Sequence, residues 1–502
     1  MIRTDSAAAG AHAIVIGSGF GGLAAAVRLG ARGYRVTVLE RLDQPGGRAA
    51  VHRQDGYTFD AGPTIITAPY LFEELWTLCG KRLADDVTLR SLDPFYQVRF
   101  DDGDAVNYTA DLESMRQQIA RIEPRDVAGF EKFMAASRRI YDVAFAELAD
   151  VPFHRVGTLL KAAPKLIQLR GFTSVYSEVC RYFRDPKMRL LFSFHPLLIG
   201  GNPFSTTAYF CLISHLERSM GVHYAEGGMG SLVKGLVGLI EGQGGTVRCE
   251  STVDQILVEG GRATGVRLES GEVLRADVVV SNADVAWTYQ ALLSKHQRRK
   301  WTDARLKRAD YSMSLFVWYF GTTRRYEDVH HHTMVLGPRY RELLDDIFIH
   351  KRLANDFSLY LHRPSATDPT LAPPGCDAWY VLAPVPNLLS GTNWAEQGEE
   401  FRQRVQHRLE TTLLPGLGEH LATSRILTPQ DFRDRLLSVN GAAFGLEPKL
   451  FQSAYFRPHN LSEEVQGLYL VGAGTHPGAG LPGVLSSARV VDKLVPPIAS
   501  RA

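Results

Sequence analysis

The chain has 502 residues, 45% hydrophobic and 22% charged, and its 56 basic and 54 acidic residues leave a net charge of +2. At roughly 150 residues per domain, this length corresponds to about three domains' worth of chain, enough for a large buried core. The composition excludes a disordered, highly charged protein. The near-neutral charge gives no electrostatic reason to expect nucleic acid as a partner.

Five cysteines lie far apart in the sequence, with no Cys-x-x-Cys pair. Their odd number and spacing argue against a disulfide framework, a zinc ribbon or a thioredoxin-type centre, and are typical of a reducing compartment. Residues 1–13 are polar and Ala-rich, without the basic-then-apolar pattern of a signal peptide. Pro and Gly interrupt the long charge-free stretches, so we expect no transmembrane helix.

A strand, a glycine-rich turn, a helix and a second strand are predicted at the start of the chain. They are Ala13–Ile16, Gly17-Ser18-Gly19-Phe20-Gly21-Gly22, Leu23–Arg32 and Tyr34–Glu40. In such a turn the first glycine permits a tight bend, the second lets a pyrophosphate approach the backbone, and the third packs the helix on the strand. Glu40, 18 residues after Gly22, stands where a carboxylate binds ribose hydroxyls. This order predicts a dinucleotide site, without distinguishing FAD from NAD.

Two further glycine-rich turns favour a flavin. Pro45-Gly46-Gly47-Arg48 follows Glu40 closely, and Arg48 suits a phosphate or the flavin edge, or is a surface arginine beside a turn. Near the C-terminus a strand over Leu468–Val471 leads into the glycine-rich run Val471–Val484, whose backbone N–H groups suit a flat ring system. A helix is expected over Leu485–Leu494. The sequence has no second strand–turn–helix unit of this kind, so one dinucleotide, FAD, is the economical interpretation.

The segment Val156–Leu169 has apolar residues at helical spacing and basic residues on the other face. Pro164 is expected to split it into two short helices. One interpretation is a surface helix pair with its apolar face in the core, and the other is an interfacial helix that inserts among lipids. The surrounding stretch Val151–Leu190 holds eight basic and two acidic residues, so the near-neutral total hides a basic patch suited to an anionic membrane.

Short β-rich runs follow in the middle of the chain, and a helix is expected over Phe401–Leu414. The predicted strands are Thr246–Glu250, Val253–Val258, Ala263–Leu268 and Val273–Val280. Together the pieces predict an α/β protein with two intertwined domains. The predicted FAD-binding domain takes residues 1–75, 225–290 and 430–502, and the substrate domain takes 76–224 and 291–429, with 151–224 as a membrane-facing helical part.

Over nearly its full length the sequence resembles the bacterial-type phytoene desaturases, flavin-dependent carotene desaturases of the amine-oxidase-like flavoprotein superfamily. The matching stretches include Val15–Gly22, Glu40–Arg48, Phe59–Thr64, Ser193–Pro196, Gly200–Phe204, Ser281–Asp284, Phe456–Asn460 and Val471–Val484. The resemblance implies a Rossmann-like FAD-binding domain of the glutathione-reductase-2/amine-oxidase type, joined to a substrate domain. It also implies stepwise dehydrogenation of phytoene towards neurosporene or lycopene, with quinone or oxygen as electron acceptor. The protein is then expected to be cytoplasmic and peripherally attached to the cytoplasmic membrane.

The motifs and the resemblance together assign the site residues. The predicted FAD-binding residues are Gly17, Ser18, Gly19, Phe20, Gly21, Gly22, Glu40, Gly47, Arg48, Gly62, Pro63, Val253, Gly472, Gly474, Gly483 and Val484. In some family members the stretch matching Gly157–Lys161 carries an Asp and an Arg proposed to act near the substrate, and Thr158 and Lys161 stand in those places here. This departure from the family pattern argues against an acid or base in the segment, and Lys161 is kept as a candidate catalytic residue together with His476, which lies in the predicted flavin loop. The alternative for Lys161 is an anionic phosphate contact, and for His476 a turn residue packed on Pro477.

Other histidines and an aspartate of the sequence are expected to have structural roles, and other functions remain as alternatives. His195 is expected to be a core histidine, and Asp60 first a turn carboxylate and only second a catalytic one. The side chains of His330-His331-His332 are expected to diverge, so no metal is predicted. Alternative functions are desaturation of a hydroxylated or methoxylated neurosporene, carotenoid isomerisation, an amine oxidase, or a non-enzymatic lipid-binding escort.

Overall fold

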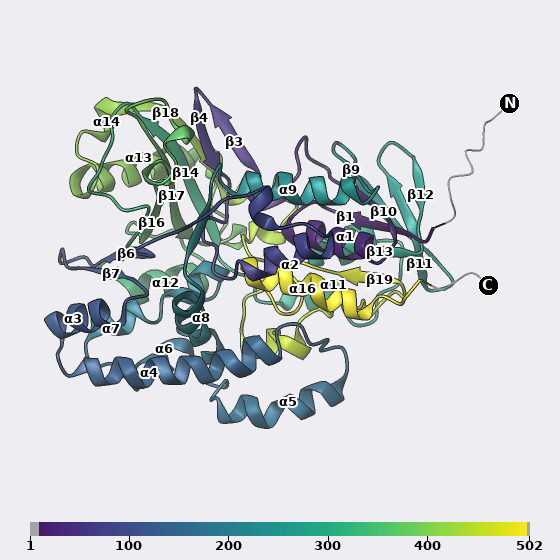
Figure 1. Ribbon diagram of the computed structural model, residues 1–502, viewed down its shortest axis with the longest axis horizontal. Coiled ribbons are helices and arrows are strands. Elements are labelled where there is room, and N and C mark those ends of the chain that lie inside the picture. Colours follow the sequence, from purple (N-terminus) through teal and green to yellow (C-terminus); the bar gives the residue numbers. More distant parts are fainter. Residues whose placement is uncertain (1–9, 499–502) are drawn as a thin grey trace.

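The structure, a computed structural model, describes residues 10–498. Residues 1–9, part of the segment in which no signal peptide is predicted, lie outside the described residues. Five parallel strands from separated parts of the chain form one sheet in the order β19-β13-β1-β2-β9 (Figure 1). These strands are β1 (His12–Ile16), β2 (Arg35–Leu39), β9 (Thr246–Arg248), β13 (Val278–Ser281) and β19 (Leu468–Leu470). All five fall within the ranges predicted for the FAD-binding domain, whose boundaries remain a prediction.

Alternate side chains of the parallel strands enter two different cores, as the period of two in a strand requires. Ala13 and Val15 of β1 pack in the core that contains the helices, while Ile14 and Ile16 pack in a second core. The helices on the first side are α1 (Phe20–Ala31), α9 (Met229–Gly242) and α16 (Leu481–Leu494). A three-stranded antiparallel sheet contributes to the second core and comprises β10 (Val253–Glu259), β11 (Arg262–Leu268) and β12 (Val273–Arg275). A parallel sheet between these layers confirms the predicted α/β class and its Rossmann-like arrangement.

The predicted strand Val273–Val280 is wrong, because the chain changes sheets within it. β12 pairs antiparallel with β11, whereas β13 pairs parallel with β1. Between them Asp277 exchanges hydrogen bonds with His12: its backbone N–H donates to the His12 carbonyl, and its carboxylate accepts from the His12 backbone N–H at 2.8 Å. The sequence does not indicate this break, because β-forming residues continue across it. The helices α1 and α16 also begin earlier than predicted, at Phe20 and Leu481, inside the glycine-rich motifs.

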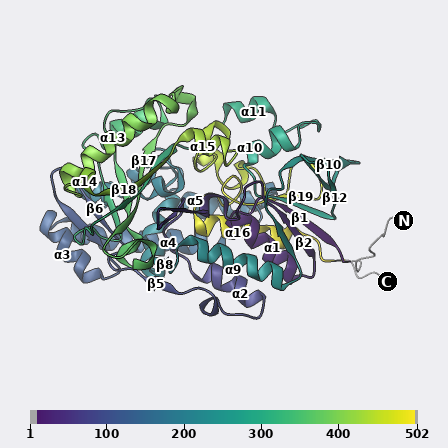
Figure 2. The same ribbon diagram turned by 90° about the horizontal axis from the view of Figure 1, so that it is seen from above.

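A second, seven-stranded sheet has the order β18-β14-β17-β16-β15-β6-β7 and lies at the opposite end of the molecule from the termini (Figures 1 and 2). Its strands are β6 (Tyr96–Arg99), β7 (Ala105–Tyr108), β14 (Ser314–Thr322), β15 (His332–Val335), β16 (Leu359–His362), β17 (Asp377–Val385) and β18 (Leu421–Leu427). One face buries Phe316, Trp318 and Trp379 against α13 (Trp394–Thr412). The other face carries Tyr319 and Tyr380, which belong to the central core.

Helices between Leu112 and Met220 form a third part, along the lower edge of the molecule in Figure 1. They are α3 (Leu112–Ile122), α4 (Asp126–Tyr141), α5 (Val156–Gln168), α6 (Val175–Val179), α7 (Pro186–Leu191) and α8 (Leu212–Met220). The expectation that Pro164 splits the segment is wrong, because α5 continues through it. Proline cannot donate to the carbonyl of Leu160, four residues earlier, but both residues are exposed and water can satisfy that oxygen. Among residues 10–498 no helix combines the length and apolar character needed to cross a bilayer.

Candidate functional site

The turn between β1 and α1 brings bare backbone to the edge of the parallel sheet. Gly17 has φ +88°, and a Cβ on Gly22 would lie 2.1 Å from the Gly17 carbonyl oxygen. A Cβ on Gly21 would lie 2.9 Å from the backbone nitrogen of Gly472, so the N- and C-terminal glycine loops touch here. Gly19 precedes α1 in an extended conformation, and no side chain from residues 10–498 caps the helix. The first N–H groups of α1 therefore remain available to an anion such as a pyrophosphate.

Glu40, at the end of β2, is buried and fixed by the glycine turn. Its Oε2 accepts hydrogen bonds from the backbone N–H of Ser18 at 2.9 Å and from the Ser18 hydroxyl at 2.5 Å. Its Oε1 accepts from the backbone N–H of Leu42 at 2.9 Å. A carboxylate accepts more hydrogen bonds than these three, so Glu40 can also bind hydroxyl groups while it stabilises the turn.

Arg48 follows a left-handed glycine, Gly46 (φ +116°), and lies half-buried at the wall of a cavity. Its Nε donates to the carbonyl of Ala443 at 2.9 Å and its Nη2 to the hydroxyl of Ser438 at 2.8 Å. Within residues 10–498 no carboxylate forms a salt bridge with it. Burial lowers the pKa of Arg48, and the nearby Asp284 carboxylate opposes that shift. The guanidinium therefore presents positive charge to the cavity.

The C-terminal glycine loop is held from behind by a buried arginine. Arg457 donates from Nη2 to the carbonyls of Ala473 and Leu446, at 2.7 and 3.0 Å, and is 2% exposed. Burial lowers its pKa to about 10, so it stays charged at neutral pH. Gly472 donates its backbone N–H to the Ser487 hydroxyl of α16 at 2.8 Å. These contacts fix the loop between β19 and α16 against the first glycine turn.

These three glycine loops open into one cavity of about 570 Å³. At one end it is lined by the β1–α1 turn, Glu40 and Arg48. At the other end apolar side chains of the seven-stranded sheet and of the helical part line it, among them Met334, Leu382, Phe210, Ile213 and Leu166. A largely apolar cavity that also reaches a nucleotide site is suited to a hydrophobic substrate beside a dinucleotide.

Most of the predicted cofactor residues line this cavity. They are Gly17, Ser18, Gly19, Phe20, Gly21, Glu40, Gly47, Arg48, Gly62, Pro63, Val253, Gly472, Gly483 and Val484. Gly22 and Gly474 lie behind its wall, where a Cβ would strike Gly17 and Val285 respectively. Their assignment as cofactor-binding residues remains a prediction, with close packing of the loops as the observed role.

The two candidate catalytic residues lie in different surroundings. His476 lines the cavity, where its Nε2 contacts the carbonyl of Leu148 at 3.2 Å and its ring packs on Phe153 with centroids 4.8 Å apart. Burial lowers its pKa to about 4, so it is neutral at physiological pH. Lys161 is exposed on α5 and is not among the residues that line the cavity. The catalytic role of both residues remains a prediction.

Asp60 and His195 are buried polar residues behind the cavity wall. The carboxylate of Asp60 accepts from the Met229 backbone N–H at 2.8 Å, and burial raises its pKa to about 7. His195 contacts the hydroxyl of Tyr96 and the carboxylate of Glu217, each at 3.2 Å. It is therefore a hydrogen-bonded core residue, as its apolar sequence context indicates.

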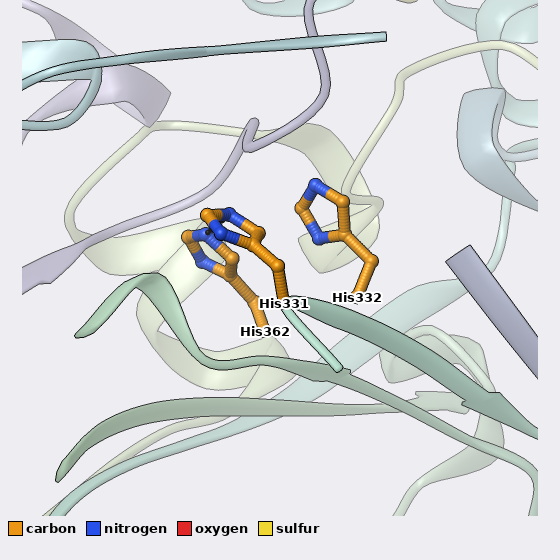
Figure 3. Close-up of side chains that lie close together, drawn as sticks. All are labelled: His331, His332 and His362. Atoms are coloured by element: carbon orange, nitrogen blue, oxygen red, sulfur yellow. Dashed lines mark hydrogen bonds between the residues drawn. The ribbon is translucent and has the colours of Figure 1, made fainter. Parts of the chain in front are cut away.

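The expectation of diverging side chains in the histidine triplet is wrong for His331 and His332, whose ring centroids are 4.5 Å apart. His331 precedes the regular part of β15, so the alternation of a strand does not separate the two rings. His362 of β16, directly opposite His332 in the antiparallel pair, completes a buried cluster (Figure 3). The sequence around the triplet gives no indication that His362, 30 residues after His332, belongs to the cluster, because only the pairing of β15 with β16 brings it there.

Comparison with known proteins identifies the family. The flavin-containing amine oxidoreductase family matches residues 20–491. A neurosporene-forming phytoene desaturase from Cereibacter sphaeroides is 51% identical over 490 residues, 97% of this chain and 94% of that protein. A lycopene-forming phytoene desaturase from Pantoea ananas is 47% identical over 482 residues, 96% and 98% of the two chains. The chain belongs to the phytoene desaturases, within the flavin-containing amine oxidoreductases.

Solved structures of low sequence identity share the fold. An oxidoreductase from Methanosarcina mazei has a TM-score of 0.66 at 18% identity, over 96% of this chain and 100% of that one. Cyclohexylamine oxidase from Brevibacterium oxydans has a TM-score of 0.63 at 14% identity, over 97% and 98%. These likenesses support the two-sheet architecture.

FAD is the cofactor of this phytoene desaturase, and the residues at the cavity fit it. The uncapped start of α1 suits the pyrophosphate, Glu40 the ribose hydroxyls, and Arg48 a phosphate or the flavin edge. The sequence analysis missed the residues that hold these groups: Ser438 and Ala443 for Arg48, and Arg457 for the C-terminal loop. Their spacing from the glycine motifs gives no signal, because tertiary packing alone brings them there.

Proposed function

We propose that this phytoene desaturase removes hydrogen from phytoene in successive steps towards neurosporene or lycopene. The observation that carries the proposal is the single cavity that joins the FAD loops to a long apolar wall. Curated relatives named as phytoene desaturases, 47–51% identical over nearly the whole chain, support the same assignment.

The residues present suit the chemistry of a hydrocarbon. Phytoene has no hydrogen-bonding group, so recognition depends on the shape of an apolar wall such as Met334, Leu382 and Phe210 provide. FAD, when bound, supplies the hydride acceptor. The chain itself has three tasks: to hold the bond to be oxidised against the cofactor, to exclude water and to accept the remaining proton. We keep His476, neutral and at the cavity wall, as a candidate proton acceptor.

We further propose that α5 attaches the protein to an anionic membrane, where phytoene dissolves. Leu166 of α5 lines the cavity, while Leu160 and Ile167 of the same helix are 66% and 63% exposed. Lys161 lies exposed beside Leu160, and no ion pair involves it within residues 10–498. An exposed apolar stripe with flanking lysines is the pattern of a helix in the membrane interface. A substrate and a quinone from the bilayer then reach the cavity from this side, with oxygen as the alternative electron acceptor.

The basic patch is smaller in the structure than the sequence indicates. Lys165 pairs with Glu147, and Lys187 with Asp102 and Asp104, all acidic residues outside Val151–Leu190. Arg155 and Lys161 are exposed near or on α5 and remain available to lipid phosphates. Each such residue contributes about 1 kcal/mol to binding of an anionic surface.

The experiment is to load the purified protein with FAD and add liposomes that contain phytoene. We expect new long-wavelength polyene absorption and, by chromatography, intermediates on the way to neurosporene or lycopene. Parallel samples with hydroxylated or methoxylated neurosporene and with amines test the alternatives, since an amine oxidase forms peroxide only when an amine is present. No new polyene from phytoene, with turnover of one of these other substrates, would reject the proposal.

A further inference from the structure

Three buried histidines, none of which belongs to the nucleotide site, lie together next to the substrate end of the cavity. His332 and His362 face each other across β15 and β16, on the same side of the sheet as Met334 and Tyr360, which line the cavity. The ring of His331 packs against both, with centroids 4.5 Å from His332 and 4.8 Å from His362 (Figure 3). We call His332, His362 and His331, in this order, the histidine row.

One end of the row is hydrogen-bonded to the cavity wall. The Tyr360 hydroxyl lies 2.8 Å from Nδ1 of His332 and 2.6 Å from the hydroxyl of Thr64. Both Thr64 and Tyr360 line the cavity. They are polar groups on a largely apolar wall, and they contact each other and the row. A proton released in the cavity thus has a hydroxyl group in reach that is bonded to an imidazole.

The other end of the row leads away from the cavity. Nε2 of His362 lies 3.0 Å from Nε2 of His331, and Nδ1 of His331 lies 2.6 Å from the hydroxyl of Thr367. Thr367 is partly exposed, so this end reaches the protein surface. Except for one break between His332 and His362, the row therefore extends from the cavity to the surface through hydrogen-bonded side chains.

A single gap separates the two halves of the row. Within residues 10–498, Nε2 of His332 and Nδ1 of His362 have no hydrogen-bond partner. One nitrogen from each of the three rings can be chosen such that all three lie within 4.8 Å of one another. The ring centroids of His332 and His362 are 5.1 Å apart, and one bridging water molecule or a ring rotation can cross a gap between neighbouring rings. The unpartnered nitrogens are the two that a proton crossing the gap would use.

The three histidines of the row are neutral, which suits them to pass a proton on and not to hold one. Burial lowers the pKa of His331 to about 3, helped by the Arg363 guanidinium, and holds those of His332 and His362 well below the usual value. No carboxylate within residues 10–498 forms an ion pair with any of them. A neutral imidazole accepts a proton on one nitrogen and releases another from the second, and a low pKa means that it does not retain the charge.

A metal fits this cluster poorly. Two imidazole nitrogens on one zinc ion lie at most about 4.2 Å apart, less than the 4.8 Å span of the cluster. Tyr360 also occupies Nδ1 of His332.

We propose that the histidine row carries the proton of each desaturation step from the cavity to solvent, with Tyr360 as its entrance. This rests on the proposed function. FAD, when bound, would supply the acceptor for the first hydrogen, which leaves the substrate as hydride. The second C–H bond then breaks so that its electron pair forms the new C=C bond and its proton passes to the Tyr360 oxygen. Tyr360 gives its own hydroxyl proton to Nδ1 of His332.

The remaining transfers follow the contacts outward. His332 releases a proton from Nε2 to Nδ1 of His362, which releases one from Nε2 to His331, and His331 releases one from Nδ1 towards Thr367. His476, the other candidate proton acceptor, has a free Nδ1 within residues 10–498, but its Nε2 contacts the carbonyl of Leu148, which offers no onward transfer to solvent.

The test uses the FAD-loaded full-length protein and phytoene in liposomes. Tyr360→Phe, which removes only the hydroxyl, and His362→Gln, which interrupts the row, should lower kcat roughly tenfold or more, with KM and FAD content unchanged. His331→Gly should lose the same activity and regain it on addition of imidazole, which a merely structural role would not allow. His330→Gln is the matched control, because His330 belongs to the same triplet but lies outside the row.

The outcomes separate this proposal from the proposed function. An active wild-type protein with unaffected Tyr360→Phe and His362→Gln variants overturns the relay alone. Stoichiometric zinc that disappears in His362→Gln also overturns it, in favour of a metal site. A wild-type protein without any desaturase activity overturns the proposed function and the relay with it. A kcat loss in both variants, together with imidazole rescue of His331→Gly, supports the relay.

Discussion

Replacing Leu160 and Ile167 of α5 by serine should release the protein from membranes without unfolding it. The two side chains are 66% and 63% exposed, so only about a third of each contributes to the fold. Full burial of such a side chain is worth about 1.5–3 kcal/mol. The exposed two thirds of both therefore offer about 2–4 kcal/mol to a lipid interface. Because about 1.4 kcal/mol changes an equilibrium tenfold, the double variant should bind roughly 30- to 800-fold more weakly.

The assay is co-flotation with anionic liposomes, with thermal unfolding and FAD content measured on the same samples. Ile349 and Leu389, 65% and 58% exposed on other elements, provide the matched control pair of serine substitutions. The control pair should bind liposomes like the wild type. Equal flotation of the α5 variant and the control pair, with both folded, would refute the reasoning that α5 enters the membrane.

Three further variants test the site and its electrostatics. Gly22→Ala places a Cβ 2.1 Å from the Gly17 carbonyl oxygen, so we expect loss of FAD and a lower unfolding temperature, and normal FAD absorbance would contradict this. Arg457→Met removes the donor to the Ala473 carbonyl and should speed FAD release roughly tenfold or more in a displacement assay. An unchanged rate would show that Arg457 does not hold the loop in place. Burial raises the pKa of Asp60 to about 7, so the folded protein keeps a proton that the unfolded chain releases near pH 4. The contribution of Asp60 to the free energy of unfolding therefore falls as the pH rises from about 4 to about 7. Asp60→Asn should flatten that fall in denaturant titrations at pH 5 and 8, and parallel curves for both proteins would show that Asp60 does not cause it.

The nucleotide-binding loops were predictable because the motifs that indicate them are formed by residues close together in the sequence. The turn Gly17–Gly22 and the acid Glu40 occur at fixed spacing around a strand and a helix, and the structure brings them to one cavity. Element boundaries were less predictable. The helix begins at Phe20 because the glycines belong to its first turn, and one run of β-forming residues, Val273–Val280, serves two sheets.

The substrate half was less predictable because its contacts join residues far apart in sequence. The buried strand Ser314–Thr322 has no polar–apolar alternation, since both of its faces are covered, so its sequence lacks the period of two that indicates a strand. His362 reaches His332 only through the pairing of β15 with β16, and Arg48 reaches Ser438 through packing between distant segments. Pro164 led to the prediction of a helix break, which was wrong because the exposed helix can leave the unpaired carbonyl to water.

The most direct test of the account is an anaerobic single turnover of the FAD-loaded protein with phytoene in liposomes. With the electron acceptor withheld, we expect one new C=C bond per FAD reduced, seen as a stoichiometric loss of oxidised-flavin absorption together with a longer polyene chromophore. Polyene formation without reduction of the flavin, or reduction of the flavin only by an amine, would contradict it.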